Sequence, residues 1–262
     1  MSAELAKFHE IRPGKRLAYL KEGGKGRAKT GLIWLGGLRS DMTGTKAEAL
    51  ASHAKATGRA LLRFDYSGHG ASDGAFTDAV ISDWLSECEA MFAAHTSGPT
   101  VICGSSMGGW LALLLAMRLK ARVAGLILLA PATDMTEKLI WAKASQAQRE
   151  TLMREGRFVE PSAYSPDDPL IITKALIEDG RQYSLMGAEI PLSCPVRILQ
   201  GDADPDVPWE HGLATYQAIR ADDCRFTLIK GGDHRLSTMR DLALLTQTAE
   251  ELCRLGDNQA GG

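Results

Sequence analysis

The chain has 262 residues, of which 45% are hydrophobic and 24% are charged, a balance typical of a folded globular protein. This length suits one large α/β domain, with room for an inserted subdomain. The formal net charge of −2 gives no electrostatic basis for binding nucleic acid or an anionic membrane surface, so neither is expected as a partner.

The cysteines and the apolar segments indicate in which cellular compartment the protein is expected. Five cysteines without a C-x-x-C pair are typical of reduced thiols in a cytosol-like environment. Charged residues such as Glu4, Lys7 and Glu10 interrupt the first stretch, so we expect neither a signal peptide nor a membrane span. The sequence therefore predicts a cytoplasmic protein.

Strand and helix patterns alternate through the first half of the chain. It opens on a predicted hairpin, residues 8–12 and 16–20, joined by Pro13-Gly14-Lys15. A Gly- and Lys-rich loop at 22–30 follows. The next expected elements, in order, are a strand at 31–35, a helix at 46–57, a strand at 60–64, a helix at 78–95, a strand from 101, a helix ending near 119 and a strand at 123–130.

The alternation stops after Pro131 and resumes near residue 194. Residues 133–193 show no convincing strand, only charged helical segments at 138–155 and 171–179, so we interpret them as an insertion into a core of residues 1–132 and 194–262. The core pattern predicts a mostly parallel, doubly wound α/β sheet with helices on both faces. Its last expected elements are a strand at 196–200, a helix at 209–220, a strand at 225–229, a helix at 237–255 and a frayed tail at 256–262.

A G-x-S-x-G motif joins an apolar strand to an Ala- and Leu-rich helix. Gly104, Ser106 and Gly108 satisfy the motif, whereas Ser105 does not, because Cys103 stands two residues before it. A strand that turns directly into a helix crowds its turn residue, so the flanking residues must lack a Cβ. Such a turn presents the serine hydroxyl at a helix N-terminus, beside backbone N–H groups that can bind an anion. The motif favours a catalytic nucleophile at Ser106 over a purely structural tight turn.

A serine hydroxyl needs a base, and the base needs an orienting acid. In a doubly wound sheet these groups belong in loops at the carboxyl ends of strands. Of the six histidines, only His234 lies late in the chain in such a loop, next to the glycines 231–232. We therefore expect His234 to be the base, the alternative being a solvated loop histidine.

The loop after the penultimate strand holds three candidates for the acid: Asp202, Asp204 and Asp206. Asp202 suits a turn cap, and Asp206 suits a helix entry, where a carboxylate is stabilised. Asp204 stands between them and is the predicted acid. Asp134 follows another strand and is an alternative, whereas Asp65 is expected to brace its own loop.

The order Ser, Asp, His resembles that of the α/β-hydrolases, and the resemblance extends along nearly the whole chain. The segments Asp65-x-x-Gly68-x-Gly70-x-Ser72 and Gly201-x-x-Asp204-x-x-Val207-Pro208 also look like that family's own. The resemblance implies the α/β-hydrolase fold, with the acid at Asp204 and the base at His234. It also implies that the insertion at 133–193 is a helical lid.

Further segments carry a closer resemblance: Thr43-Gly44-Thr45-Lys46, Arg63–Gly68, Gly104–Leu111, Val207-Pro208-Trp209 and Asp233-His234-Arg235. They look like those of the mitochondrial palmitoyl-protein thioesterases, a family that also cleaves acyl glucuronides such as that of mycophenolic acid. Its animal members carry a transit peptide, so the chain looks like a bacterial or otherwise untargeted relative.

The resemblance also predicts an oxyanion hole and substrate contacts. The family pattern gives its two backbone donors as the N–H groups of Met107 and Leu38. Arg39 and Arg235 stand beside Leu38 and His234, where they are expected either to hold an anionic substrate group, such as a glucuronate carboxylate, or to be solvated.

Apolar residues of the insertion are candidate contacts for an acyl chain, or else form the small core of the lid itself. They include Trp141 and Met153, together with Ile140, Leu152 and Phe158.

These residues predict a serine hydrolase for carboxylic esters or thioesters that acts through an acyl-enzyme on a small molecule or an acylated protein. The mechanism requires no metal and no cofactor. The alternatives are an acyltransferase, a C–C or peptide hydrolase with the same triad, and a non-catalytic binding module, because a fold does not determine a function. The sequence does not define the acyl chain length, the physiological substrate or the oligomeric state.

Overall fold

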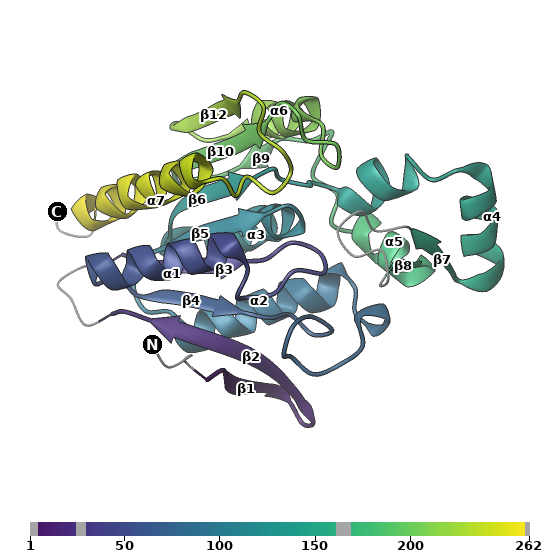
Figure 1. Cartoon of the computed structure of the whole chain (residues 1–262), viewed down its shortest axis with the longest axis horizontal. Coiled ribbons are helices and arrows are strands. Elements are labelled where there is room, and N and C mark those ends of the chain that lie inside the picture. The colour runs from purple at the N-terminus through teal and green to yellow at the C-terminus, as the bar shows by residue number, and fades with distance from the viewer. Residues whose placement is uncertain (1–4, 25–29, 161–168, 260–262) are drawn as a thin grey trace.

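The computed structural model describes residues 5–24, 30–160 and 169–259. Its centre is an eight-stranded sheet with the order β1-β2-β4-β3-β5-β6-β10-β12 (Figure 1). The pairs β1–β2 and β2–β4 are antiparallel, and all further neighbours are parallel. These strands are β1 (Lys7–Arg12), β2 (Lys15–Glu22), β3 (Gly31–Leu35), β4 (Leu61–Phe64), β5 (Thr100–Ser105), β6 (Val123–Leu129), β10 (Val196–Gly201) and β12 (Cys224–Ile229).

Helices cover both faces of the sheet, as the alternating pattern predicts. Helices α1 (Thr45–Thr57) and α7 (Met239–Gln259) lie side by side on one face, in front of the sheet in Figure 1. Helices α2 (Ile81–His95), α3 (Met107–Leu119) and α6 (Trp209–Ala218) pack on the other face. Each face has its own buried apolar cluster, because the continuous apolar strands present side chains to both sides.

The core elements lie where the sequence predicts them, with small shifts at their ends. Helix α2 begins at Ile81 because residues 76–78 form a separate 3-10 turn. The prediction of a frayed tail is wrong for 256–259, since α7 continues to Gln259 and the Asp257 carboxylate accepts the Thr30 N–H at 2.8 Å. Residues 260–262 of that tail, and 25–29 of the predicted loop, lie outside the described residues.

The insertion differs from the prediction of helices alone. It contains α4 (Gln146–Glu155), α5 (Lys174–Arg181), a π-helical turn at Thr136–Trp141 and an antiparallel pair, β7 (Arg157–Glu160) with β8 (Leu170–Thr173). Phe158 faces Ile172 across this pair, and both are buried in a small separate core. The sequence does not predict these two strands, because each is short and the two are not adjacent in the sequence. Residues 161–168, between β7 and β8, lie outside the described residues.

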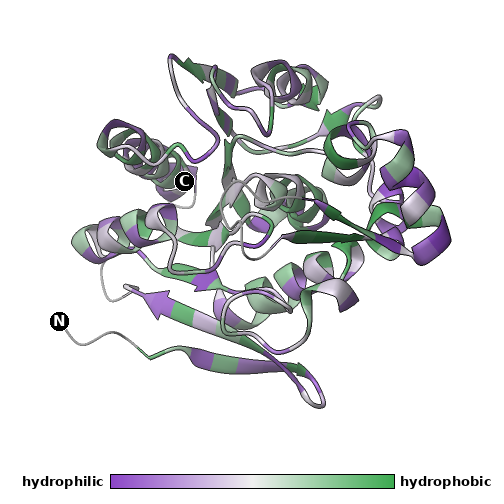
Figure 2. Cartoon of the chain, turned by 45° about the vertical axis from the view of Figure 1, so that its right-hand side comes forward, coloured by the Kyte–Doolittle hydropathy of each residue, from purple (hydrophilic) through white to green (hydrophobic). Residues whose placement is uncertain are grey.

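The insertion stands apart from the sheet, with α4, α5, β7 and β8 on the right of Figure 1. Figure 2 shows a largely hydrophilic α4 on the outside and hydrophobic strands at the centre of the molecule. A short parallel pair, β9 (Ile190–Pro191) with β11 (Ile219–Arg220), follows the insertion. Within the described parts of the chain, no helix has the length and apolar character needed to cross a membrane.

Candidate active site

The turn between β5 and α3 holds Ser106 in a strained backbone conformation, with φ of 54° and ψ of −119°. The two glycines of the motif have a direct steric reason. A Cβ added at Gly104 would lie 2.2 Å from the Gly108 carbonyl oxygen, and one added at Gly108 would lie 2.1 Å from the Leu35 carbonyl oxygen. Only glycine therefore fits on either side of this serine.

Ser106, His234 and Asp204 come together from three separate strand-end loops. The Nε2 atom of His234 lies 3.2 Å from the Ser106 hydroxyl oxygen, and its Nδ1 atom lies 2.8 Å from a carboxylate oxygen of Asp204. An ionised carboxylate only accepts hydrogen bonds, so Nδ1 carries the proton and Nε2 presents a lone pair to the serine. The arrangement suits proton transfer from a hydroxyl.

The loop after β10 fixes the carboxylate of Asp204. Its Oδ1 atom accepts the backbone N–H groups of Asp206 and Val207, each at 2.9 Å. Its Oδ2 atom accepts from the Gln200 side-chain amide at 3.3 Å as well as from His234. The Asp204 side chain is fully buried and that of His234 is 16% exposed, so water has little access to the bond between them.

The other candidate acids have partners elsewhere. Asp202 accepts from the Lys230 ammonium at 2.8 Å and from the Gly231 N–H at 2.6 Å, and so joins the loops after β10 and β12. Asp134 accepts hydrogen bonds from each of residues 184–186 and thereby secures the end of the insertion. Asp65 accepts backbone N–H groups from its own loop and from a neighbouring one.

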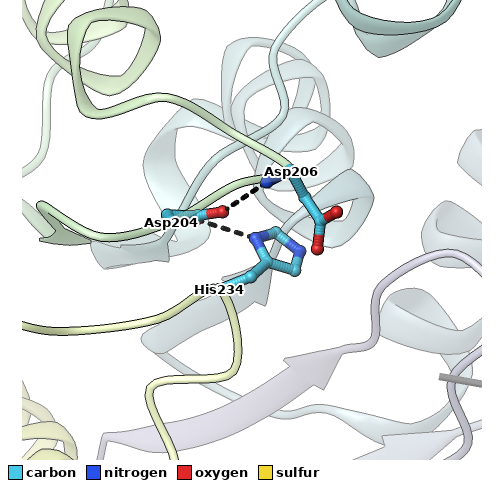
Figure 3. Close-up of side chains that lie close together, drawn as sticks. All are labelled: Asp204, Asp206 and His234. Atoms are coloured by element: carbon cyan, nitrogen blue, oxygen red, sulfur yellow. Dashed lines mark hydrogen bonds and ion pairs between the residues drawn. The ribbon is translucent and has the colours of Figure 1, made fainter. Parts of the chain in front are cut away.

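Asp206 is a second carboxylate beside the histidine, and Figure 3 shows it near the edge of the imidazole ring. The ligand atoms of Asp204, Asp206 and His234 lie within 4.8 Å of one another, a spacing that a metal ion can use. Both Asp204 oxygens, however, already accept backbone, amide and imidazole hydrogen bonds. These hydrogen bonds already use much of the acceptor capacity of the Asp204 carboxylate.

The loop after β3 passes directly over the serine. A Cβ added at Gly37 would lie 3.3 Å from that of Ser106, and the Ser40 N–H donates to the Gly37 carbonyl at 3.1 Å to close a turn. Leu38 occupies the second position of this turn. Met107 follows Ser106 as the first residue of α3, and its side chain is buried in the core. Both residues predicted as oxyanion donors thus adjoin the serine.

A cavity of about 710 Å³ opens above Ser106 and His234, between the core and the insertion. Arg39 and Arg235 both line it, and their contact with a substrate stays a prediction. One wall is apolar and comes mostly from the insertion: Met135, Leu139, Ile140, Ala144, Leu170 and Ile172. Charged residues also line the cavity, from the core (Asp41, Lys46, Asp206 and Arg235) and from the insertion (Lys143 and Glu160).

Trp141 and Met153, named as candidate acyl contacts or as part of the core of the insertion, do not line the cavity as the described residues define it. Trp141 lies instead in the separate core of the insertion, with the guanidinium groups of Arg149 and Arg181 over its ring at 5.0 and 5.2 Å. Met153 lies on the outer side of α4 and is 59% exposed. Ile140, another of the candidates, does line the cavity, together with Leu139, and both belong to the π-helical turn.

Two lysines of the cavity also went unpredicted. Lys46 donates to the backbone carbonyl of Arg235, and Lys143 donates to that of Asp206 at 3.0 Å. Each bond therefore reaches a loop that carries a member of the Ser–His–Asp arrangement. A helical lysine is ordinarily solvated, so its spacing in the sequence does not reveal such a contact.

Residues 39–241 match the protein family described as serine aminopeptidase, S33. The chain is an α/β hydrolase of that family. Mouse palmitoyl-protein thioesterase ABHD10, mitochondrial, is 35% identical over 236 residues, which cover 90% of this chain and 78% of the mouse protein. The human protein of the same name is 33% identical over 90% of this chain and 76% of its own length.

Solved structures agree with these relatives. A putative hydrolase from Agrobacterium vitis S4 superposes with a TM-score of 0.89 at 43% identity, covering 95% of this chain and 98% of that one. Mouse α/β hydrolase domain-containing protein 10 gives 0.86 at 32% identity over the same shares. The predicted fold, family and hydrolytic enzyme class of this α/β hydrolase are thus confirmed. The curated relatives are named mitochondrial, and a cytoplasmic location stays a prediction for this chain.

Proposed function

We propose that this α/β hydrolase cleaves carboxylic ester or thioester bonds, with Ser106 as nucleophile, His234 as general base and Asp204 as the orienting acid. The observation that carries the proposal is the continuous chain of hydrogen bonds from Asp204 through His234 to the Ser106 hydroxyl. It ends at a serine held in a strained turn, on the floor of a cavity large enough for a substrate.

In the first half-reaction, Ser106 Oγ attacks the carbonyl carbon while its proton passes to His234 Nε2. Asp204 stabilises the resulting imidazolium through the Nδ1 proton. The tetrahedral intermediate collapses, and the leaving alcohol or thiol takes the proton from His234. In the second half-reaction, His234 takes a proton from a water molecule, whose oxygen attacks the acyl-enzyme. His234 then returns this proton to Ser106 Oγ as the bond between Oγ and the acyl carbon breaks and the carboxylic acid leaves.

The negative charge of each tetrahedral intermediate develops on the former carbonyl oxygen. The backbone N–H groups of Leu38 and Met107 are the proposed donors to it, since one lies in the loop over Ser106 and the other begins α3. The positive end of the α3 dipole adds to this stabilisation. Removing one such donor in other enzymes costs about 10²–10³ in turnover.

The apolar and the charged residues that line the cavity suit different parts of a substrate. The apolar wall suits an acyl chain, and residues 133–193 would act as the lid that covers it. The guanidinium groups of Arg39 and Arg235 suit an anionic group on the leaving side, such as the carboxylate of an acyl glucuronide. Acylated proteins enter the proposal through the relatives that are named palmitoyl-protein thioesterases.

The test is turnover of a p-nitrophenyl ester and an acyl-CoA, each at several chain lengths, by wild type and Ser106→Ala. We expect the variant to lose all measurable turnover, while Ser86→Ala, at an exposed serine of α2, retains it. Hydrolysis by Ser106→Ala at the wild-type rate would overturn the proposal. Transfer of the acyl group to an added alcohol, rather than to water, would point to an acyltransferase.

A further inference from the structure

Lys46 is the residue of the cavity whose position the mechanism leaves unexplained. It lies in the first turn of α1 and lines the same cavity as Ser106 and His234. Its ammonium donates to the backbone carbonyl of Arg235, the residue that follows His234. This contact joins positions 189 residues apart in the chain and ties α1 directly to the loop that carries the proposed base.

The charges that face this ammonium come from three elements. Asp233 and Arg235 belong to the loop after β12, Asp204 to the loop after β10, and Asp241 to α7. Burial is the largest influence and lowers the pKa of Lys46 to about 8, against the opposing attraction of the carboxylates. Lys46 is therefore mostly charged at pH 7 and loses its proton as the pH rises through about 8.

The loop that carries His234 is tied to its surroundings on both sides of the histidine. Before it, the Gly231 N–H donates to the Asp202 carboxylate at 2.6 Å. After it, Leu236 has a positive φ of 45°, with its N–H bound to the Asp233 side chain at 3.0 Å. A strained residue holds one geometry only where contacts fix it, and the bond from Lys46 to the Arg235 carbonyl is such a contact directly beside the histidine.

We propose that Lys46 is a positioning residue, whose bond to the Arg235 carbonyl keeps the His234 imidazole aligned between Asp204 and Ser106. This inference rests on the proposed function of those three residues. A displacement of about 1 Å in such an arrangement costs up to about 10² in rate. Taking the ammonium partly out of water has a desolvation cost, which is consistent with a role beyond stability.

The first experiment compares kcat, KM and thermal unfolding for wild type, Lys46→Met and Lys46→Arg, with Lys55→Met as a control on the exposed side of the same helix. We expect Lys46→Met to lower kcat by about 10- to 100-fold, with little change in KM, for esters with neutral and anionic leaving groups alike. Its unfolding midpoint at pH 7 should equal or exceed that of wild type. Lys46→Arg retains a charged donor and should recover most of the rate.

The second experiment is the pH profile of kcat. A neutral amine is a weaker donor than an ammonium, so wild-type kcat should fall on the alkaline side with a midpoint of about 8. Lys46→Arg stays charged and should lack this fall. If kcat of Lys46→Arg fell at alkaline pH as in wild type, the positioning role would be contradicted. This test does not depend on whether Lys46→Met folds.

Two further outcomes would overturn the inference. One is a wild-type kcat in Lys46→Met. The other is a raised KM confined to esters with anionic leaving groups, which would assign Lys46 to substrate binding. Ser106→Ala, measured in parallel, separates this inference from the function on which it rests. An inactive Ser106→Ala beside a fully active Lys46→Met defeats the positioning role alone, whereas an active Ser106→Ala defeats both.

Discussion

At the amino ends of β3 and β4, Arg59 has a full set of partners: the Glu250 carboxylate at 2.9 and 3.1 Å, Asp257 at 3.1 Å and the Thr30 carbonyl at 3.2 Å. At the carboxyl ends of the same sheet, Ser106 has a strained backbone and Lys46 is a partly buried ammonium with a lowered pKa. The Arg59 ion pairs and the proposed nucleophile thus lie at opposite ends of the strands. We therefore expect substitutions around Arg59 to change stability and substitutions around Ser106 to change activity.

Among substitutions at the carboxyl ends of the strands, we expect the largest loss of activity at Asp204. Asp204→Asn cannot hold the imidazolium of His234 and should lower kcat by about 10³–10⁴. Asp202→Asn is the matched control in the same loop and should cost far less, because Asp202 binds Lys230 and Gly231 instead. Steady-state ester hydrolysis measures both variants. An equal loss in the two would show that Asp204 is not the orienting acid.

A smaller loss is expected at the oxyanion loop. Proline fits the second position of a turn but has no N–H, so Leu38→Pro should remove one donor and lower kcat by about 10²–10³. Leu38→Ala keeps the N–H and should stay within a small factor of wild type for short-chain esters. Should Leu38→Pro and Leu38→Ala behave alike, Leu38 would not be an oxyanion donor.

The apolar wall gives a third, still smaller effect. Ile140→Ala removes buried methylene contacts from a long acyl chain and should lower kcat/KM for long-chain substrates by about tenfold, with short-chain esters unaffected. Met153→Ala is the control, since its side chain is exposed on the outside of α4. Chain-length profiles of the two variants provide the measurement. A selective loss in Met153→Ala instead would place the acyl chain elsewhere.

Substitutions at the amino ends of the strands should change the stability of the protein and leave its activity unchanged. The Arg59 guanidinium is the main cause that lowers the pKa of Glu250 to about 2. Its stabilising effect is therefore complete above the ordinary carboxyl pKa and is lost as the pH falls towards about 2. At pH 7, Glu250→Gln should reduce the free energy of unfolding by about 1–3 kcal/mol, with kcat unchanged.

Denaturant titration at pH 7 and at pH 3 checks this prediction, and the difference between Glu250→Gln and wild type should shrink at pH 3. Glu155→Gln, at an exposed carboxylate of α4, is the control. A lower kcat in Glu250→Gln, without a change in stability, would break the separation between the two ends of the sheet.

The sequence predicts the core well because its signals are local. Continuous apolar strands, helical periodicity and the glycines beside Ser106 each depend on a few neighbouring residues. The position of Asp204 and His234 at strand ends is equally local, and parallel topology alone brings such ends together. Their catalytic roles remain predictions, although the geometry joins them by hydrogen bonds.

The insertion and the lysines could not be predicted in the same way. The pairing of Phe158 with Ile172 joins two strands of only four residues each, which are not adjacent in the sequence. Trp141 is as hydrophobic as Ile140, and only the π-helical turn decides which of them faces the cavity. The bond from Lys46 to the Arg235 carbonyl depends on contact between α1 and a loop far along the chain.

Covalent labelling of the nucleophile tests the central claim most directly. Wild type, Ser106→Ala and Asp204→Asn would be treated with a fluorophosphonate, and the modified peptide identified by mass spectrometry. We predict one adduct, on Ser106, formed rapidly in wild type, slowly in Asp204→Asn and never in Ser106→Ala. An adduct on Ser105 or any other residue, or continued ester hydrolysis by fully labelled protein, would contradict the account.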